Sequence, residues 1–222
     1  GGVSANSWGT SYAGHFLLEA DKRGYALPIG FKAKWLTYQK NEARKWRKSS
    51  KYYNNEFAQA YRLYSLSLAN SPDLASMNRL RETSGISSST KRRLAAAYAL
   101  IGKKSTAESI LKSITSNDYS RRYYYNYGSE IRDKAMSLET YTLTGDEVQS
   151  IKLAKDIAES LSSDRWMSTQ TTSYGLLAMA QYALKNGENS GINANYTWNG
   201  TQTSINTAKS LFVKDMNSLK SN

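Results

Sequence analysis

The chain has 222 residues, 40% of them hydrophobic, which is enough for one main globular domain with a real core. The absence of cysteine excludes disulfides, thiol nucleophiles and cysteine metal sites, and a single histidine argues against a zinc site made of protein ligands. The net charge of +12 raises the question of an acidic partner, and no apolar run approaches the roughly 20 residues that a membrane-spanning helix needs.

The first predicted element is a helix over residues 8 to about 22, in which Tyr12 and Phe16, four residues apart, belong to an apolar stripe. Gly24 is placed to end this helix. A proline is tolerated in the first turn of a helix because its missing N–H has no partner there, so Pro28 is expected to begin the second helix.

Further amphipathic helices are expected up to residue 187, and their short connections favour antiparallel neighbours. Ser71, before Pro72, is predicted to cap one of them, and Gly145-Asp146 is predicted to end one helix and cap the next. The last helix, over residues 169 to 185, is apolar on more than one side and is predicted to be an inner, buried element. The helices between have apolar stripes at Phe57, Tyr61 and Tyr64, at Leu74, Met77 and Leu80, at Leu94, Ala97 and Tyr98, at Ala107, Ile110 and Leu111, at Ile131, Ala135 and Leu138, and at Ile151, Ala154 and Leu161.

The character of the sequence changes after Lys185, so residues 188–222 are predicted to be a linker followed by a short β-rich segment. Asn199-Gly200, between polar and aromatic residues, is typical of the two-residue turn of a β-hairpin. A hairpin followed by a helix through Ala208 and Leu211 is the alternative. Residues 1–187 are expected to form an all-α domain of helical hairpins, which is either a closed α/α toroid or an open superhelical array.

Two blocks are the most informative part of the sequence. The two blocks share one design: an aromatic residue, a small hydroxyl-rich turn and then an apolar helix. The first block is residues 8–20, followed by Gly24-Tyr25-Ala26-Leu27-Pro28, and the second is residues 166–179. Together the blocks resemble the thioester domain of bacterial alpha-2-macroglobulin-like proteins, the large exported protease traps. The resemblance extends over most of residues 3 to about 187.

The resemblance implies that this chain is the C-terminal larger part of an incomplete α/α toroid, from which the β-rich segment leads into a neighbouring domain. It implies no catalytic, cofactor or metal site here, and the chain is not expected to be an enzyme. Structural and inter-domain roles are implied for the residues that open the two blocks, which are Trp8, Thr10, Tyr12, His15, Trp166, Thr169 and Gln170.

The family's decisive motif is Cys-x-Glu-Gln, whose cysteine and glutamine condense into a thioester, and it is absent from these residues. It is therefore expected upstream of Gly1, or lost from the parent protein. By the same resemblance, the parent is a bacterial endopeptidase inhibitor that is exported to the periplasm or the cell envelope, with its export signal outside this chain. Its remaining domains and the target proteases are the implied partners.

The unperturbed pKa of a histidine lies near neutrality, so His15 is considered as a general acid or base, but no activated nucleophile motif accompanies it and a buried hydrogen-bonding role is favoured. Two pairs of carboxylates, Glu130 with Asp133 and Glu19 with Asp21, keep open an independent toroid that binds or cleaves polysaccharide. Ordinary surface positions are favoured for both pairs, because neither pair has a motif that fixes its distance across a cleft.

Basic residues gather in three groups. They are expected on solvated outer faces of helices, and nucleic-acid binding is not expected, since no nucleic-acid motif accompanies them. The tyrosines Tyr123, Tyr124, Tyr125 and Tyr127 are expected to lie in a packed loop, with sugar stacking or protein binding as the alternatives. The basic groups are Lys40, Arg44, Lys45, Arg47, Lys48 and Lys51, then Lys91, Arg92 and Arg93, then Arg121 and Arg122.

Overall fold

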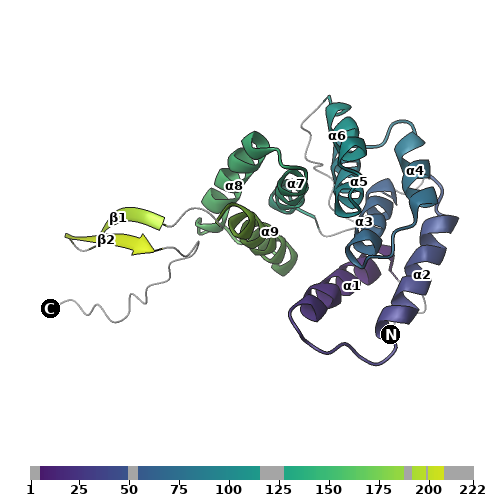
Figure 1. Cartoon of the computed structure of the whole chain (residues 1–222), viewed down its shortest axis with the longest axis horizontal. Coiled ribbons are helices and arrows are strands. Elements are labelled where there is room, and N and C mark those ends of the chain that lie inside the picture. The colour runs from purple at the N-terminus through teal and green to yellow at the C-terminus, as the bar shows by residue number, and fades with distance from the viewer. Residues whose placement is uncertain (1–5, 50–54, 116–127, 188–191, 199, 208–222) are drawn as a thin grey trace.

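The computed structural model describes residues 6–49, 55–115, 128–187, 192–198 and 200–207. Within these ranges the chain is helical up to residue 187, and a two-stranded antiparallel sheet follows (Figure 1). The elements are α1 (Ser7–Lys22), α2 (Phe31–Lys45), α3 (Asn55–Leu68), α4 (Leu74–Glu82), α5 (Ser88–Leu100), α6 (Lys104–Lys112), α7 (Glu130–Thr144), α8 (Glu147–Leu161), α9 (Thr169–Gly187), β1 (Ile192–Trp198) and β2 (Thr201–Thr207).

The odd-numbered helices form an inner row, and the even-numbered helices cover its outer side. In the inner row α3 packs against α1 and α5, and α7 packs against α5 and α9. On the outside α2 and α4 lie against α3, α6 lies against α5, and α8 lies against α7 and α9 (Figure 1). This alternation is that of consecutive helical hairpins, and it confirms the predicted all-α class. In the described part of the chain, no helix is both long and apolar enough to cross a membrane.

Helix starts depend on side chains that accept hydrogen bonds from free backbone N–H groups. Asp73 caps α4, because its carboxylate accepts from the N–H of Ser76 at 3.1 Å, so the prediction that Ser71 provides this cap is wrong. The second helix also begins later than predicted. Gly30, with a left-handed φ of 72°, precedes the first residue of α2, and Pro28 lies outside the helix.

The predicted boundary at Gly145-Asp146 is confirmed. Gly145 ends α7 with a φ of 83°, a conformation that costs glycine little because it has no Cβ. The Asp146 carboxylate then accepts from the N–H of Gln149 at 3.1 Å and caps α8. This pair of residues therefore makes the reversal between two antiparallel helices.

The buried face of α1 differs from the predicted apolar stripe. Trp8, His15 and Leu18 face the core, whereas Phe16 is 69% exposed. At the other end of the row, α9 is an inner helix as predicted, but it is only partly buried, because Leu176 is 57% exposed. Both findings have the same cause: among the described helices, α1 and α9 are the two ends of the inner row, and part of each is left uncovered.

The predicted hairpin is confirmed for the described residues 192–198 and 200–207. Antiparallel pairing runs from Ile192 opposite Thr207 to Trp198 opposite Thr201, and Gly200 has the positive φ, 78°, that a tight hairpin turn requires. The alternative helix through Ala208 and Leu211 lies outside the described residues.

Candidate functional site

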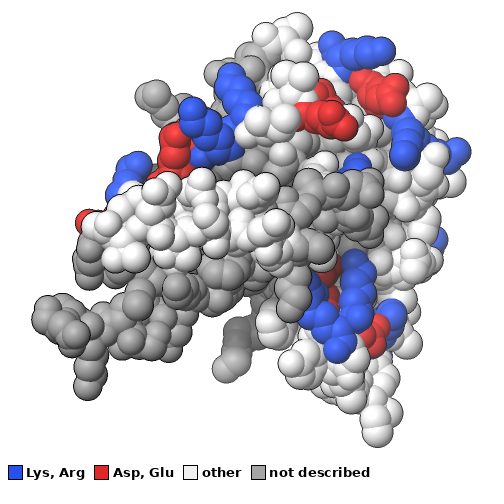
Figure 2. Space-filling view, turned by 60° about the vertical axis from the view of Figure 1, so that its left-hand side comes forward, with Lys and Arg blue, Asp and Glu red and all other residues white. Residues whose placement is uncertain are grey.

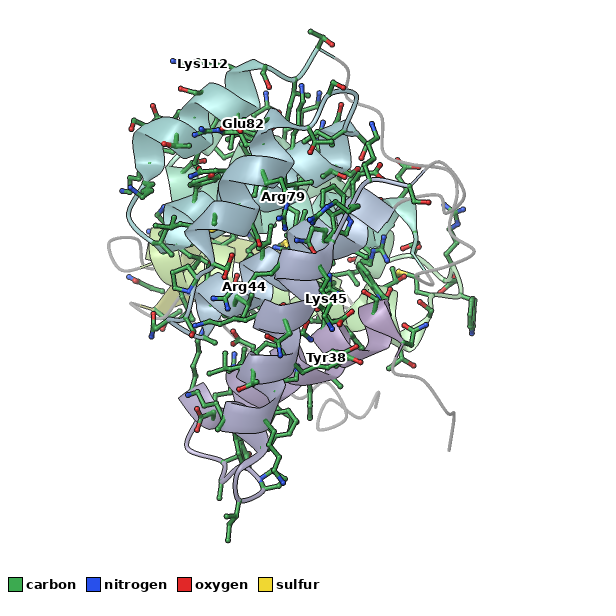
Figure 3. The ribbon with its side chains drawn as sticks, turned by 90° about the vertical axis from the view of Figure 1, so that its right-hand side faces the viewer. Tyr38, Arg44, Lys45, Arg79, Glu82 and Lys112 are labelled. Atoms are coloured by element: carbon green, nitrogen blue, oxygen red, sulfur yellow. The ribbon has the colours of Figure 1, made fainter. Side chains whose placement is uncertain are left out.

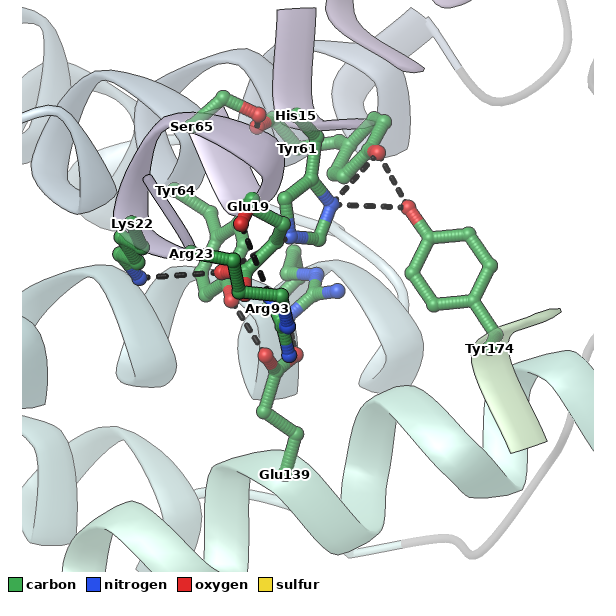
Figure 4. Close-up of polar contacts among 10 residues, drawn as sticks. All are labelled: His15, Glu19, Lys22, Arg23, Tyr61, Tyr64, Ser65, Arg93, Glu139 and Tyr174. Carbon is green, nitrogen blue, oxygen red and sulfur yellow. Dashed lines mark hydrogen bonds and ion pairs between the residues drawn. The ribbon is translucent and has the colours of Figure 1, made fainter. Parts of the chain in front are cut away.

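A buried polar cluster lies where the inner helices converge (Figure 4). Every odd-numbered helix contributes to it, and each of its side chains is at most 4% exposed. We call it the central polar cluster. It consists of His15 from α1, Tyr61 and Tyr64 from α3, Arg93 from α5, Glu139 from α7 and Tyr174 from α9.

Arg93 and Glu139 form an ion pair at the centre of this cluster. Glu139 also accepts a hydrogen bond from the Tyr64 hydroxyl, and the Arg93 guanidinium lies 3.8 Å from the centroid of the Tyr64 ring. Burial alone would raise the pKa of Glu139, but attraction to Arg93 and hydrogen bonds from Tyr64 and Arg93 hold this pKa below its ordinary value. Two charges thus lie inside the helical layer, where each compensates the other.

His15 is held by two tyrosine hydroxyls. Its Nδ1 lies 3.0 Å from the hydroxyl of Tyr61 and 3.3 Å from that of Tyr174. Tyr174 also donates to Tyr61, so the three side chains form one buried hydrogen-bonded group. Burial lowers the pKa of His15 to about 4, with Glu139 opposing this shift and Arg93 adding to it. His15 is therefore a neutral, buried, hydrogen-bonding residue at pH 7, as expected from the sequence.

An open groove with a volume of about 230 Å³ runs between α1 and α9 beside the cluster. The His15 imidazole forms part of its wall, and the Nε2 of His15 has no hydrogen-bond partner among the described residues. The nearest carboxylate oxygen is Oε1 of Glu19, 4.0 Å away, and Glu19 is itself held by Lys22 at 3.0 Å and Arg23 at 2.8 Å (Figure 4). The groove is lined by Tyr12, His15, Phe16, Glu19, Arg23, Ser173, Tyr174 and Leu177.

A second buried cation joins the two sequence blocks. Arg132, near the start of α7, binds the Asp133 carboxylate through two nitrogens at 2.6 and 2.9 Å, and it donates to the side-chain oxygen of Gln170 at 3.1 Å. Its guanidinium lies 4.8 Å from the ring centroid of Trp8. Trp8 and Gln170, which were singled out in separate blocks, therefore meet on either side of an arginine that the sequence did not point to.

The other residues singled out from the blocks are spread around this region. Thr10 donates to the carbonyl of Asn6 at 2.7 Å, and the Tyr12 ring lies 5.9 Å from the Tyr174 ring. Thr169 is exposed at the start of α9.

Trp166, which opens the second block, lies just before α9 and is 88% exposed. The reason is local. Ser168 provides the cap of α9 by accepting from the N–H of Thr171 at 3.3 Å, which leaves Trp166 in the preceding turn.

The two carboxylate pairs do not face one another across a cleft. Glu130 forms a surface ion pair with Lys134 at 3.1 Å, and Asp21 forms one with Lys32 at 2.9 Å. Asp133 was predicted to lie at the surface, but it is buried and forms an ion pair with the buried Arg132. Among the described residues, no group of three or more His, Cys, Asp or Glu side chains is arranged to hold a metal ion.

The basic group of α2 lies on the surface, as predicted, but much of its charge is compensated. Arg44 binds Asp73 at 2.7 Å, and Lys45 lies 3.5 Å from Glu42. Figure 3 shows this side of the molecule, and Figure 2 shows Lys and Arg next to Asp and Glu on another face rather than a uniform basic patch.

The prediction that Arg92 and Arg93 lie on an outer face is wrong, because both are at most 2% exposed. They belong to the inner helix α5, where Arg93 has Glu139 as its buried partner. Lys51, Arg121, Arg122 and the tyrosines of residues 123–127 lie outside the described residues.

Sequence reasoning missed most of the central polar cluster. Tyr61 and Tyr64 were assigned to an apolar stripe, and Glu139 was not singled out at all. One signal was present: Arg93 lies four residues before Ala97 and Glu139 lies four residues after Ala135, so each charge shares a helix face with a stripe residue. A charge inside an apolar stripe is rarely buried without a partner of opposite charge, so the two positions together indicate a buried pair.

Comparison with known proteins found similar folds among solved structures of bacterial alpha-2-macroglobulins. Neither the protein-family models nor the curated proteins gave a match. Among solved structures, native alpha-2-macroglobulin from Escherichia coli, spanning domain MG7 to the C-terminus, is 18% identical, with a TM-score of 0.71 over 92% of this chain and 33% of that one.

Two further structures give a similar result. Salmonella alpha-2-macroglobulin reacted with methylamine is 20% identical, with a TM-score of 0.72 over 92% of this chain and 14% of that chain. Trypsin-activated alpha-2-macroglobulin from Escherichia coli is 17% identical, with a TM-score of 0.64 over the same shares of the two chains, 92% and 14%. This chain therefore has the fold of a segment of these proteins and spans a third of their length or less.

Proposed function

We propose that this chain is the C-terminal larger part of a thioester-type domain in a bacterial alpha-2-macroglobulin-like protease trap, and that it serves there as a non-catalytic scaffold. The observation that carries this proposal is the match of 92% of the chain to alpha-2-macroglobulins from two bacteria, with TM-scores of 0.71 and 0.72. The order of inner and outer helices is consistent with an α/α toroid.

The ends of the inner row support an incomplete toroid. Phe16 on α1 and Leu176 on α9 are large apolar side chains with 69% and 57% of their surface exposed. Large apolar side chains exposed at both ends of the row are consistent with neighbouring helices that lie outside these residues. We infer that further helices of the parent domain cover these residues.

The central polar cluster supports a scaffolding role. Arg93, Glu139 and Tyr64 bind one another across three inner helices, so their side chains hold the helices in one register. A thioester in the parent would need a cysteine to supply its sulfur, and these residues contain no cysteine. We therefore assign the thioester to a segment outside these residues. The role assigned to this chain is to shield that segment from water.

In the parent protein, cleavage of a bait segment would change the conformation, expose the thioester and allow a nucleophile of the protease to be captured. The parent would be exported to the periplasm or the cell envelope. The hairpin β1–β2 would lead into a neighbouring domain, and the remaining domains and the target proteases would be the partners. A polysaccharide-binding or polysaccharide-cleaving toroid is not favoured, since neither pair places both of its carboxylates in a cleft. Glu19 lines the groove, but Asp21 forms an ion pair with Lys32 outside it. Asp133 is buried against Arg132, and Glu130 forms an ion pair with Lys134.

Treatment with methylamine followed by mass spectrometry tests this proposal. The chain alone should gain no adduct, whereas a longer polypeptide that adds the upstream sequence with its Cys-x-Glu-Gln motif should gain one amine. Replacement of that cysteine by serine is the control and should abolish the adduct. A specific adduct on the chain alone, hydrolysis of a polysaccharide by it, or an upstream sequence that completes no helical domain would overturn the proposal.

A further inference from the structure

The connection between α1 and α2 exposes an apolar tip. Its residues 25–29, Tyr-Ala-Leu-Pro-Ile, carry no charge, and Ile29 is fully exposed while Tyr25 is 69% exposed. Neither side chain belongs to the hydrophobic core. A run of exposed apolar residues is avoided on protein surfaces unless it has a function, so the tip calls for a binding partner.

The tip projects from the helical body. A glycine with a left-handed φ stands at each of its ends, Gly24 at 84° and Gly30 at 72°, and a Cβ at either position would meet nothing within 4 Å. In Figure 1 this connection runs below α1 and α2, at the lower edge of the molecule. The tip is therefore a projection, and no described helix or strand covers it.

Basic side chains stand directly behind the tip, at the end of α1 and the start of α2. Four basic residues and two acidic residues lie there, so the charge around the tip is positive even where ion pairs form. Figure 2 is turned about the vertical axis, and blue side chains lie just above the white tip at the bottom of that view. The residues are Lys22, Arg23, Lys32 and Lys34, with Glu19 and Asp21.

We propose that this loop is a membrane-contact site that binds the surface of an anionic lipid bilayer. Tyr25 and Ile29 enter the headgroup region, and the basic side chains behind them lie level with the lipid phosphates. An anionic bilayer presents the matching order, since its apolar interior lies beneath a layer of negative headgroups. Tyrosine favours this boundary because its ring is apolar and its hydroxyl is polar. The net charge of +12 attracts the whole chain to such a surface.

The contact is limited to the interface of the bilayer. Backbone N–H and C=O groups of a loop are costly in hydrocarbon, so only the side chains of the tip leave water. A protein partner would need an apolar pocket with an acidic rim of matching shape, whereas a fluid bilayer adapts to a projecting loop. The helices inferred to complete the parent domain cover Phe16 and Leu176 at the ends of the inner row, and they do not account for this tip.

Co-sedimentation of the chain with lipid vesicles tests the inference. Binding to phosphatidylcholine vesicles that contain about 30% phosphatidylglycerol should be roughly tenfold tighter than binding to phosphatidylcholine alone, and salt should weaken it. Tyr25→Ser combined with Ile29→Ser should weaken this binding roughly tenfold and leave the melting temperature unchanged, because both side chains are exposed. Val148→Ser combined with Ile151→Ser, an exposed apolar pair on α8, is the matched control and should leave binding unchanged.

The absence of cysteine allows contact to be measured at the tip itself. Ile29→Cys introduces a single thiol, and an environment-sensitive dye attached to it should brighten and shift to the blue when the anionic vesicles are added. The same dye on Val148→Cys should not respond.

A second pair of variants tests the local charge. Lys32→Gln combined with Lys34→Gln should weaken vesicle binding roughly threefold or more. Lys152→Gln combined with Lys155→Gln removes the same charge from the exposed side of α8 and should weaken it less.

Equal binding to the two kinds of vesicle would overturn the inference, as would an equal loss of binding in the tip variants and their controls. A dye at residue 29 that does not respond would also overturn it and would assign the tip to a protein partner. The proposed function does not depend on this result, because amine incorporation is measured separately on the longer polypeptide.

Discussion

Arg93 and Glu139 lie 46 residues apart in the sequence and form an ion pair between α5 and α7, with at most 4% of either side chain exposed. Two charges removed from water in this way add little net stability, because their desolvation offsets their attraction. They do restrict how the two helices pack, since any shift along α7 would leave both charges buried and unpaired. The pair therefore selects one arrangement of the inner row.

Loss of one partner should be far more costly than loss of the pair. Glu139→Gln leaves the Arg93 charge buried without a counter-charge, so the free energy of unfolding in urea should fall by about 3 to 5 kcal/mol. Glu130→Gln, which removes an exposed ion pair with Lys134, is the matched control on the same helix and should change it by less than about 1 kcal/mol. If Glu139→Gln fails to fold, the double variant Arg93→Met/Glu139→Leu should fold, and equal effects of the two single variants would contradict the buried pair.

Stability should fall between pH 7 and pH 5 because of His15. The pKa of His15 is lowered from 6.5 to about 4 in the folded chain. Between these two pH values the unfolded chain binds more protons than the folded chain, so the free energy of unfolding decreases as the pH falls. This difference amounts to about 2 kcal/mol over the two pH units. Urea unfolding of the chain and of His15→Gln at both pH values measures it. A pH dependence that the substitution leaves intact would assign the effect to other groups.

Gly14 on α1 should not tolerate alanine. A Cβ at this position would lie 2.1 Å from the Trp35 ring, and the indole of Trp35 also donates to the Thr10 carbonyl at 3.0 Å. We expect Gly14→Ala to lower the free energy of unfolding by roughly 1 to 3 kcal/mol, the usual cost of overpacking.

Gly9 of the same helix provides the matched control. A Cβ there would meet nothing closer than the Asn6 side chain at 3.4 Å, and alanine favours the helix, so Gly9→Ala should be neutral or stabilise the chain by up to about 1 kcal/mol. A Gly14→Ala variant as stable as Gly9→Ala would show that α1 and α2 pack less closely than described.

The exposed ends of the inner row should make the chain bind hydrophobic dyes and self-associate. Phe16→Ser combined with Leu176→Ser should reduce both effects without lowering the melting temperature, because these side chains are already 69% and 57% exposed. Val148→Ser, on the outer helix α8 and 76% exposed, is the control and should change neither effect. Dye fluorescence and light scattering provide the measurements. A monomer that binds no dye would argue against the missing helices proposed above.

Local features were determined by the sequence itself. Apolar residues at helical spacing predicted the helices, Gly145-Asp146 predicted the reversal between α7 and α8, and Asn199-Gly200 predicted the hairpin. These signals act over a few residues: a glycine that adopts positive φ or a side chain that caps a helix needs no distant partner. The class of the fold followed from them for the same reason.

Burial was decided only by the tertiary structure. Phe16 belongs to an apolar stripe but is exposed, because it lies on the wall of the open groove between α1 and α9, the two ends of the inner row. Arg93 belongs to a basic run but is buried, because α5 is an inner helix and Glu139 reaches it from α7. Helical spacing shows which residues share a face, but whether that face meets water, another helix or a buried counter-charge depends on segments far away in the chain.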